Sequence, residues 1–324
     1  MIGKLFEVIK DYNLPSKMLE MLESLDIDAQ QLLADNYDEN SNYFCRVQPA
    51  KIAHAFEADP INEPFLYHYT DLNSLKAILQ SHSFLIGRYT DMNDKSEKRY
   101  TYTLCKEILK KAGATRNELQ VFNDDISNQF LDYYIMSLTH NKSSQALANY
   151  GDIAIQFKNQ DIQDHLANKI TPPYFYKKLY PGDGLVYPLK VLYDRKEQLA
   201  YISTIMNAWL TAFRNKDRDY KDMIQIRDEV LKALELYSQC FKDSLLYQEE
   251  EIRFVVVKIM DKDHHTMPDL FFNKKPKIKL DIDPSMISSV IVSHKLENKI
   301  NAIQEILKSY GYKNTKVQVT DLLY

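Results

Sequence analysis

The stretch Gln248-Glu249-Glu250-Glu251-Ile252-Arg253-Phe254-Val255-Val256-Val257-Lys258 joins three carboxylates to a run of β-branched and aromatic residues. That run indicates a buried strand. Because side chains alternate between the two faces of a strand, Glu249, Glu251 and Arg253 are expected on one face. Charged groups that enter a core are costly unless they are solvated or paired. The pattern therefore predicts either a functional cleft or a structural ion-pair network, and both interpretations stay open.

Length and composition limit the class of protein. The chain has 324 residues, of which 45% are hydrophobic and 27% are charged, as in ordinary globular proteins. Its formal net charge of −4 gives no general attraction to nucleic acid or to an anionic membrane. Only 7 glycines are present, with no Gly-x-Gly-x-x-Gly and no Walker sequence. This argues against a Rossmann dinucleotide fold and against a P-loop enzyme.

Cysteine usage and the N-terminus bear on the location of the protein. Cys45, Cys105 and Cys240 are far apart and form no C-x-x-C pair, so free thiols are expected in a reducing compartment. The N-terminus lacks the apolar core of a signal peptide. No apolar run approaches the ~20 residues that cross a bilayer. We therefore expect a cytoplasmic protein without membrane contact.

Residues 1–60 are predicted to form a helical accessory region. Apolar residues recur at helical spacing in this stretch, and prolines at Pro60 and Pro64 mark its end. The region either binds a partner or caps the rest of the chain.

Residues 64–324 are predicted to form a main α+β domain with mixed or antiparallel sheets and packed helices. Pro188 falls inside one predicted strand and indicates an edge strand or a bulge. Strands are expected over 65–70, 84–86, 133–140, 153–157, 185–193, 278–282, 286–292 and 317–323, and helices over 72–79, 96–111, 196–213, 218–242 and 296–310. In the first of these strands, one face is expected to carry Leu66, His68 and Thr70, and the other Phe65, Tyr67 and Tyr69.

The segment 261–276 is predicted to be a solvated loop. It is polar and ends close to three lysines, Lys274, Lys275 and Lys277. His264 and His265 are adjacent, and no third ligand follows at a spacing typical of zinc sites. We therefore expect no metal site in this chain.

Four short elements, taken in order, resemble the bacterial DUF2971 family. They are Leu66-Tyr67-His68-Tyr69-Thr70, Asn93-Asp94-x-x-Glu97, Tyr150-Gly151 before an apolar strand, and Glu249-x-Glu251-x-Arg253. The resemblance covers about residues 64–324 and extends to the last strand and Tyr324. One departure is the segment before Tyr150, where the family has a more aromatic, tryptophan-containing sequence.

The same order of elements is similar, more distantly, to the ADP-ribosyltransferase superfamily. That resemblance implies an ADP-ribosyltransferase-like core, NAD as co-substrate, and His68, Tyr150 and Glu251 as the functional set. Glu251 would stabilise the positive charge that develops on the ribose, and Glu249 would activate the acceptor as a base. The cofactor-binding residues that the resemblance implies are His68, Tyr69, Asn93, Tyr150 and Arg253.

Three functions follow as hypotheses. The first is an NAD-consuming ADP-ribosyltransferase-like enzyme, a bacterial toxin or phage-defence effector that modifies a protein or a nucleic acid. The second is a non-catalytic protein that binds a nucleotide or a partner. The third is a metal-dependent nuclease that uses Asp91, Asp94 and the Glu249/Glu251 pair. The first requires Glu251 to face a cleft with His68 and Tyr150, and a closed buried pair with Arg253 would remove its main support.

Overall fold

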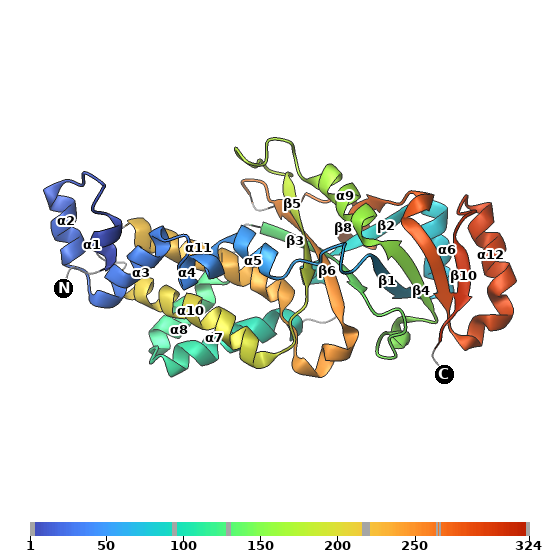
Figure 1. Cartoon of the computed structure of the whole chain (residues 1–324), viewed down its shortest axis with the longest axis horizontal. Helices are drawn as coiled ribbons and strands as arrows, with labels where there is room; N and C mark the ends of the chain where they lie inside the picture. The colour runs from blue at the N-terminus through green and yellow to red at the C-terminus, as the bar shows by residue number, and fades with distance from the viewer. Residues whose placement is uncertain are drawn as a thin grey trace. The chain divides into compact units, whose positions relative to one another are not determined.

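The computed structural model describes residues 4–92, 96–127, 131–215, 221–263, 265 and 267–321. It divides into two compact units, and most of their helices and strands are labelled in Figure 1. The helical unit comprises residues 1–55, 96–128 and 192–244, and the sheet unit comprises residues 56–95, 129–191 and 245–324. The predicted α+β class is confirmed.

The helical unit is built around α10 and α11, which lie side by side and also pack against α7 (Figure 1). Trp209 of α10 is fully buried and stacks on Phe213, with ring centroids 5.3 Å apart. None of the helices described here has the length and apolar character to cross a membrane. The helices of this unit are α1 (Lys4–Val8), α2 (Ser16–Glu23), α3 (Ile27–Tyr37), α4 (Asn42–Val47), α5 (Pro49–Ala55), α7 (Ser96–Lys111), α8 (Arg116–Asp125), α10 (Arg195–Arg214) and α11 (Lys221–Cys240).

The N-terminal helices do not stand apart as a separate accessory region. Helices α3, α4 and α5 pack against α10 and α11, which the sequence analysis placed in the main domain. The reason is that α10 and α11 bury residues such as Ile202 and Leu234 on several sides, so additional helices must cover them. The boundaries of this unit therefore differ from the predicted 1–60 and 64–324.

The sheet unit contains one sheet of ten described strands in the order β10-β9-β4-β1-β3-β2-β8-β7, with β6 paired to β3 and β5 paired to β6. All pairs are antiparallel except β9 with β10. The strands are β1 (Phe65–Thr70), β2 (Ser83–Arg88), β3 (Leu131–Thr139), β4 (Ile153–Lys158), β5 (Gly184–Lys190), β6 (Glu251–Ile259), β7 (Leu270–Phe272), β8 (Lys275–Asp281), β9 (Ile287–Val292) and β10 (Lys316–Val319). The helices are α6 (Leu72–Ser81), α9 (Asn159–Ile170) and α12 (Ile300–Ser309), with short 3-10 turns η1 (Tyr89–Asp91), η2 (Leu147–Tyr150), η4 (Ser244–Glu249), η5 (Pro284–Met286) and η6 (His294–Lys299).

One face of the sheet forms the main apolar core with α6, α9 and α12. Leu79, Leu166 and Ile303 from these helices pack among buried residues of the strands, and burial of this apolar area stabilises the unit. The alternation predicted for β1 is confirmed, because Leu66 belongs to this core and Tyr67 packs on the opposite face.

The opposite face carries a row of polar side chains across three strands. The Gln156 side-chain amide donates to the Tyr67 hydroxyl (2.9 Å), and the Ser289 hydroxyl donates to the Gln156 carbonyl oxygen (2.7 Å). These residues are cross-strand partners in β1, β4 and β9. Their hydrogen bonds satisfy polar groups that would otherwise be costly to bury.

Pro188 lies in β5, which pairs with β6 alone among the named strands. The predicted edge strand is therefore confirmed. Proline is tolerated there because an edge strand does not need every backbone N–H for the ladder.

The sheet divides along one edge of β3. Strand β6 pairs with the whole length of the other edge, from Leu131 to Thr139. On the divided edge, β2 pairs at Tyr134 and Ile135, whereas β1 pairs at Thr139. We call the gap between β1 and β2, beside Met136–Leu138, the fork.

Candidate functional site

A cavity of about 290 Å³ lies at the fork. It is lined by residues of β1, β2, β3, β8 and the turn η1, so it belongs entirely to the sheet unit. Ligand pockets start at about 300 Å³, so this cavity is at the lower end of that range. We call it the fork pocket. Its charged lining residues are Arg88, Asp91, Lys275 and Lys277, and His68 lies in its wall.

The cations of the fork pocket differ in how firmly they are held. Arg88 Nε donates to Asp132 Oδ1 (2.6 Å), and Lys275 Nζ donates to the carbonyl oxygen of Asp91 (2.9 Å). Burial, and then the nearby Lys275, lower the pKa of Lys277, while Asp91 opposes the shift. Within the described residues, the Lys277 ammonium has no hydrogen-bond or ion-pair partner. Among the described lining residues, positive charges therefore outnumber negative ones, and the Lys277 ammonium is not bound by any other described side chain.

Gly87 makes room for this ammonium. A Cβ atom at position 87 would lie 3.1 Å from Lys277 Nζ, closer than most real contacts of a Cβ atom. Gly87 is also the cross-strand partner of Lys277 in the β2–β8 ladder. The absence of a side chain thus lets the ammonium approach the backbone of β2.

His68 contributes hydrogen bonding rather than charge. Its Nδ1 lies 3.4 Å from the carbonyl oxygen of Ser137, and its ring meets Phe84 edge-on with centroids 4.7 Å apart. Burial lowers the pKa of His68 to about 4, and the bond to Ser137 opposes this shift. The ring is therefore neutral at pH 7. With Nδ1 as the donor to Ser137, Nε2 is an acceptor suited to a ligand hydroxyl.

The lowered pKa of His68 should make the free energy of unfolding depend on pH. Its pKa is about 4 in the folded protein and near the ordinary histidine value of 6.5 in the unfolded chain, so above pH 6.5 the ring is neutral in both states. Between pH 6.5 and 4 only the unfolded state binds the proton, and the free energy of unfolding falls with decreasing pH. We expect a loss of about 2 kcal/mol, less than the full shift because the ring keeps some contact with solvent. Urea denaturation at pH 7 and pH 4.5 should show this loss in wild type and a smaller one in His68→Gln; equal losses would contradict the assignment.

Glu251 and Arg253 form a buried ion pair on one face of β6. Arg253 Nε lies 3.0 Å from Glu251 Oε1, and Nη2 lies 3.0 Å from Oε2, so the contact is bidentate. Glu251 is 7% exposed and Arg253 is 0% exposed. Their predicted common face is confirmed. Neither residue lines the fork pocket, and the geometry favours the structural interpretation of the pair.

Glu249 does not share that face, which corrects the prediction for this residue. It belongs to the 3-10 turn η4, and β6 begins only at Glu251. Between them Glu250 has φ 46°, a left-handed conformation that breaks the strand alternation. The carbonyl oxygen of Glu250 accepts a hydrogen bond from the Thr139 hydroxyl (3.1 Å), which holds this turn.

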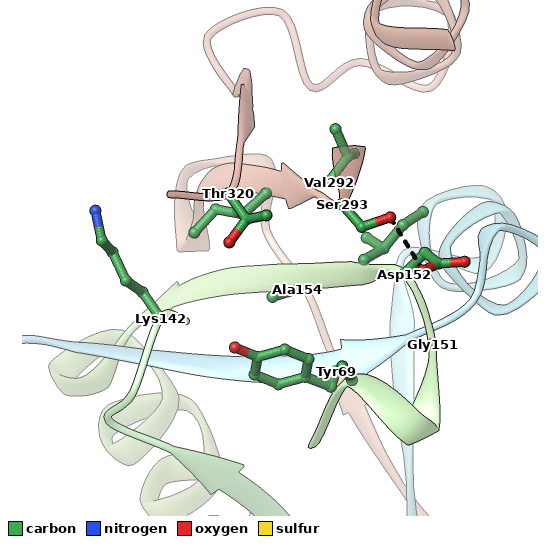
Figure 2. A pocket seen from close by; sticks show the side chains of 11 residues that line it. Tyr69, Lys142, Gly151, Asp152, Ala154, Val292, Ser293 and Thr320 are labelled. Carbon is green, nitrogen blue, oxygen red and sulfur yellow. Dashed lines mark hydrogen bonds between the residues drawn. The ribbon is translucent and has the colours of Figure 1, made fainter. Parts of the chain in front are cut away.

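Tyr69 lies beside a second, much smaller hollow in the sheet unit (Figure 2). Its volume of about 20 Å³ is the size of one water molecule, too small for a nucleotide. The Tyr69 hydroxyl accepts from the Ser144 backbone N–H (2.6 Å) and donates to the Asn141 carbonyl oxygen (3.3 Å). Tyr150 is 65% exposed and does not line the hollow, although the adjacent Gly151 does.

The remaining predicted residues are only partly described. Asn93 and Asp94 lie outside the described residues, as does Tyr324. Glu97, the last residue of the same motif, pairs with Lys242 at 3.0 Å inside the helical unit. Of the predicted set of three, His68 lines the fork pocket, whereas Tyr150 and Glu251 line neither of the two cavities described for the sheet unit.

One group of potential metal ligands is present in the described part of the chain. Asp261, Asp263 and His265 place ligand atoms within 4.8 Å of one another on an exposed loop after β6. The Asp261 carboxylate already accepts from the backbone N–H groups of the other two, as in an Asx turn, which accounts for the arrangement. Asp91, Glu249 and Glu251 form no such group with one another, and Asp94, the fourth residue of the nuclease hypothesis, lies outside the described residues.

Comparison with known proteins returned no match to this chain among family models, among curated proteins or among solved structures. The resemblances to the DUF2971 family and to ADP-ribosyltransferases therefore rest on the residues quoted above.

The sequence analysis missed Arg88, Lys275 and Lys277 as site residues. A signal was present, because Lys275, Lys277 and Lys279 alternate at the period of a strand and must share one face. The prediction began the strand at residue 278, so these lysines were assigned to a loop, whereas β8 begins at Lys275.

Proposed function

We propose that this protein binds a phosphate-bearing small molecule in the fork pocket. The observation that carries the proposal is the convergence of Arg88, Lys275 and Lys277 on one cavity, whose lining, as far as the structure describes it, includes one carboxylate, that of Asp91. This local excess of positive charge occurs in a chain with a net charge of −4.

The chemistry of the lining suits phosphate oxygens. Lysine and arginine form the strongest hydrogen bonds to phosphate because both partners are charged. The half-buried Lys277 lies close to the positive charge of Lys275, so an anion between the two ammonium groups relieves their repulsion. Neutral His68 at the wall would accept from a sugar hydroxyl. A cytoplasmic location, expected from the free cysteines, would supply such ligands.

An NAD-consuming transferase acting on a protein or nucleic-acid acceptor is the second candidate. What favours it is the place of His68, the ribose-binding residue of the predicted set, in a cavity that suits a pyrophosphate. For catalysis, Glu251 would have to leave Arg253 and reach the ligand. NAD⁺ therefore belongs among the ligands to test, together with an assay of its consumption by wild type and Glu251→Gln.

Lys277→Gln is expected to weaken phosphate binding about ten- to hundredfold, because it removes one charge-assisted hydrogen bond. The measurement is titration calorimetry of the whole chain with pyrophosphate, ATP and NAD⁺ at low salt. Lys274→Gln is the matched control, since Lys274 is an exposed lysine on the neighbouring turn and does not line the pocket. We expect it to change affinity less than twofold. Absence of binding by all three probes, or equal affinity of Lys277→Gln and wild type, would refute the proposal.

A further inference from the structure

The hairpin of β7 and β8 adds an aromatic surface beside the fork pocket. Asn273 and Lys274 form its two-residue loop, with φ of 50° and 63°. Two consecutive left-handed residues are typical of a type I′ turn, which fixes the register of the flanking strands. The side-chain direction of each residue in this hairpin can therefore be read from its pairing.

The register places Phe272 on the face of the two pocket lysines. Phe272 is the cross-strand partner of Lys275, and Leu270 is the partner of Lys277. Cross-strand partners point to the same side of a sheet, with Cβ atoms about 5 Å apart. Phe271 pairs with Pro276 and therefore points to the other side.

Phe272 is 53% exposed, so about half of its surface is accessible to a ligand. A phenyl ring beside two ammonium groups matches a ligand that has both a flat π-system and a phosphate. An acidic peptide or a simple phosphate would use the lysines and leave the ring without a role. The position of the Phe272 ring therefore favours ligands that carry a flat π-system as well as a phosphate.

We propose that the fork pocket takes a nucleoside phosphate whose base stacks on Phe272 while its phosphate lies between Lys275 and Lys277. This inference rests on the proposed phosphate-binding function and names its ligand class. The volume of about 290 Å³ supports it, because a cavity of that size holds phosphate and ribose more readily than an entire nucleotide. The base then lies at the rim, where the exposed ring is.

The test compares three probes, AMP, ribose 5-phosphate and inorganic pyrophosphate, by titration calorimetry on the full chain. Because stacking of a base on an aromatic ring contributes to the binding free energy, wild type should bind AMP about tenfold more tightly than ribose 5-phosphate. Phe272→Ala should lose this tenfold preference and keep its affinity for ribose 5-phosphate. Phe271→Ala, a neighbour of similar exposure on the other face, should keep the preference. Phe272→Leu, which retains apolar bulk without a ring, should behave as Phe272→Ala.

The outcomes separate this inference from the function on which it rests. Equal affinity of wild type for AMP and ribose 5-phosphate would overturn the base-stacking inference and leave phosphate binding intact. Equal effects of Phe271→Ala and Phe272→Ala would also overturn it, since only one of the two rings faces the lysines. Failure of all three probes to bind would remove the proposed function itself. A strong preference for pyrophosphate over AMP would identify a simple phosphate as the ligand.

Discussion

Glutamine in place of Glu251 is expected to lower the free energy of unfolding by about 3–5 kcal/mol, because it takes the carboxylate from a fully buried guanidinium. Glu251 holds Arg253 through two bonds of 3.0 Å, and the pair lies at the start of β6, where β3 and β5 flank it. The substitution removes the carboxylate that accepts both of these bonds from the buried guanidinium, and a buried charge that loses such a partner is costly. The loss is therefore expected even though the substitution preserves the shape of the side chain.

The measurement must report on the sheet unit. Trp209 is the single tryptophan and lies in the helical unit, so its fluorescence would not report directly on β6. Amide hydrogen exchange of β6 during urea denaturation gives the required signal. Arg253→Met should be as destabilising as Glu251→Gln.

The double variant Glu251→Leu/Arg253→Met tests whether the cost arises from an unbalanced charge. It should regain most of the lost stability, because replacing both ions of a buried pair by apolar residues is often neutral. A Glu251→Gln variant with wild-type stability that no longer consumes NAD⁺ would instead support the catalytic assignment. The same experiment therefore decides between the structural and the catalytic interpretation of this strand.

Local patterns predicted most of the strands and some of their details. The alternation of apolar and aromatic residues in 65–70 was sufficient to assign the two faces of β1, because one face must enter a core. Pro188 limited β5 to an edge position or a bulge, because proline lacks the N–H that a central strand needs, and the structure has the edge position. The shared face of Glu251 and Arg253 followed from the same periodicity.

The candidate site could not be predicted because non-local pairing creates it. The fork exists because β1 and β2 meet β3 at different points, and nothing in the sequence of β3 states where each neighbour pairs. The predicted face of Glu249 was wrong for a different reason. Glu250 has a left-handed backbone conformation, which is unfavourable for a glutamate and is held here by the hydrogen bond from Thr139. Helices α8 and α9 and the short strand β7 were not predicted.

Gly151→Ala is expected to destabilise the sheet unit by about 3 kcal/mol for a steric reason. Gly151 connects η2 to β4 with φ 153°, and a Cβ atom there would lie 2.2 Å from the Thr70 carbonyl oxygen and 2.6 Å from the Asp71 backbone nitrogen. Both neighbours are backbone atoms, so the clash is relieved only if the chain moves. Figure 2 shows Gly151 in the loop that leads into β4.

The backbone shift that Gly151→Ala requires would also displace neighbouring elements, and this explains the size of the expected loss of stability. Thr70 ends β1, and the Asp71 carboxylate caps α6 by accepting from the N–H groups of Asn73 and Ser74. Gly311→Ala is the matched control in the same unit, because Gly311 has φ 91° but no atom within 4 Å of the added Cβ. Gly311→Ala should lower the free energy of unfolding by only about 1 kcal/mol, which is the strain of an alanine in the left-handed conformation. Urea denaturation followed by exchange of the β1 and β4 amides measures both, and equal costs for the two variants would show that backbone conformation, not the contact with Thr70, requires glycine at position 151.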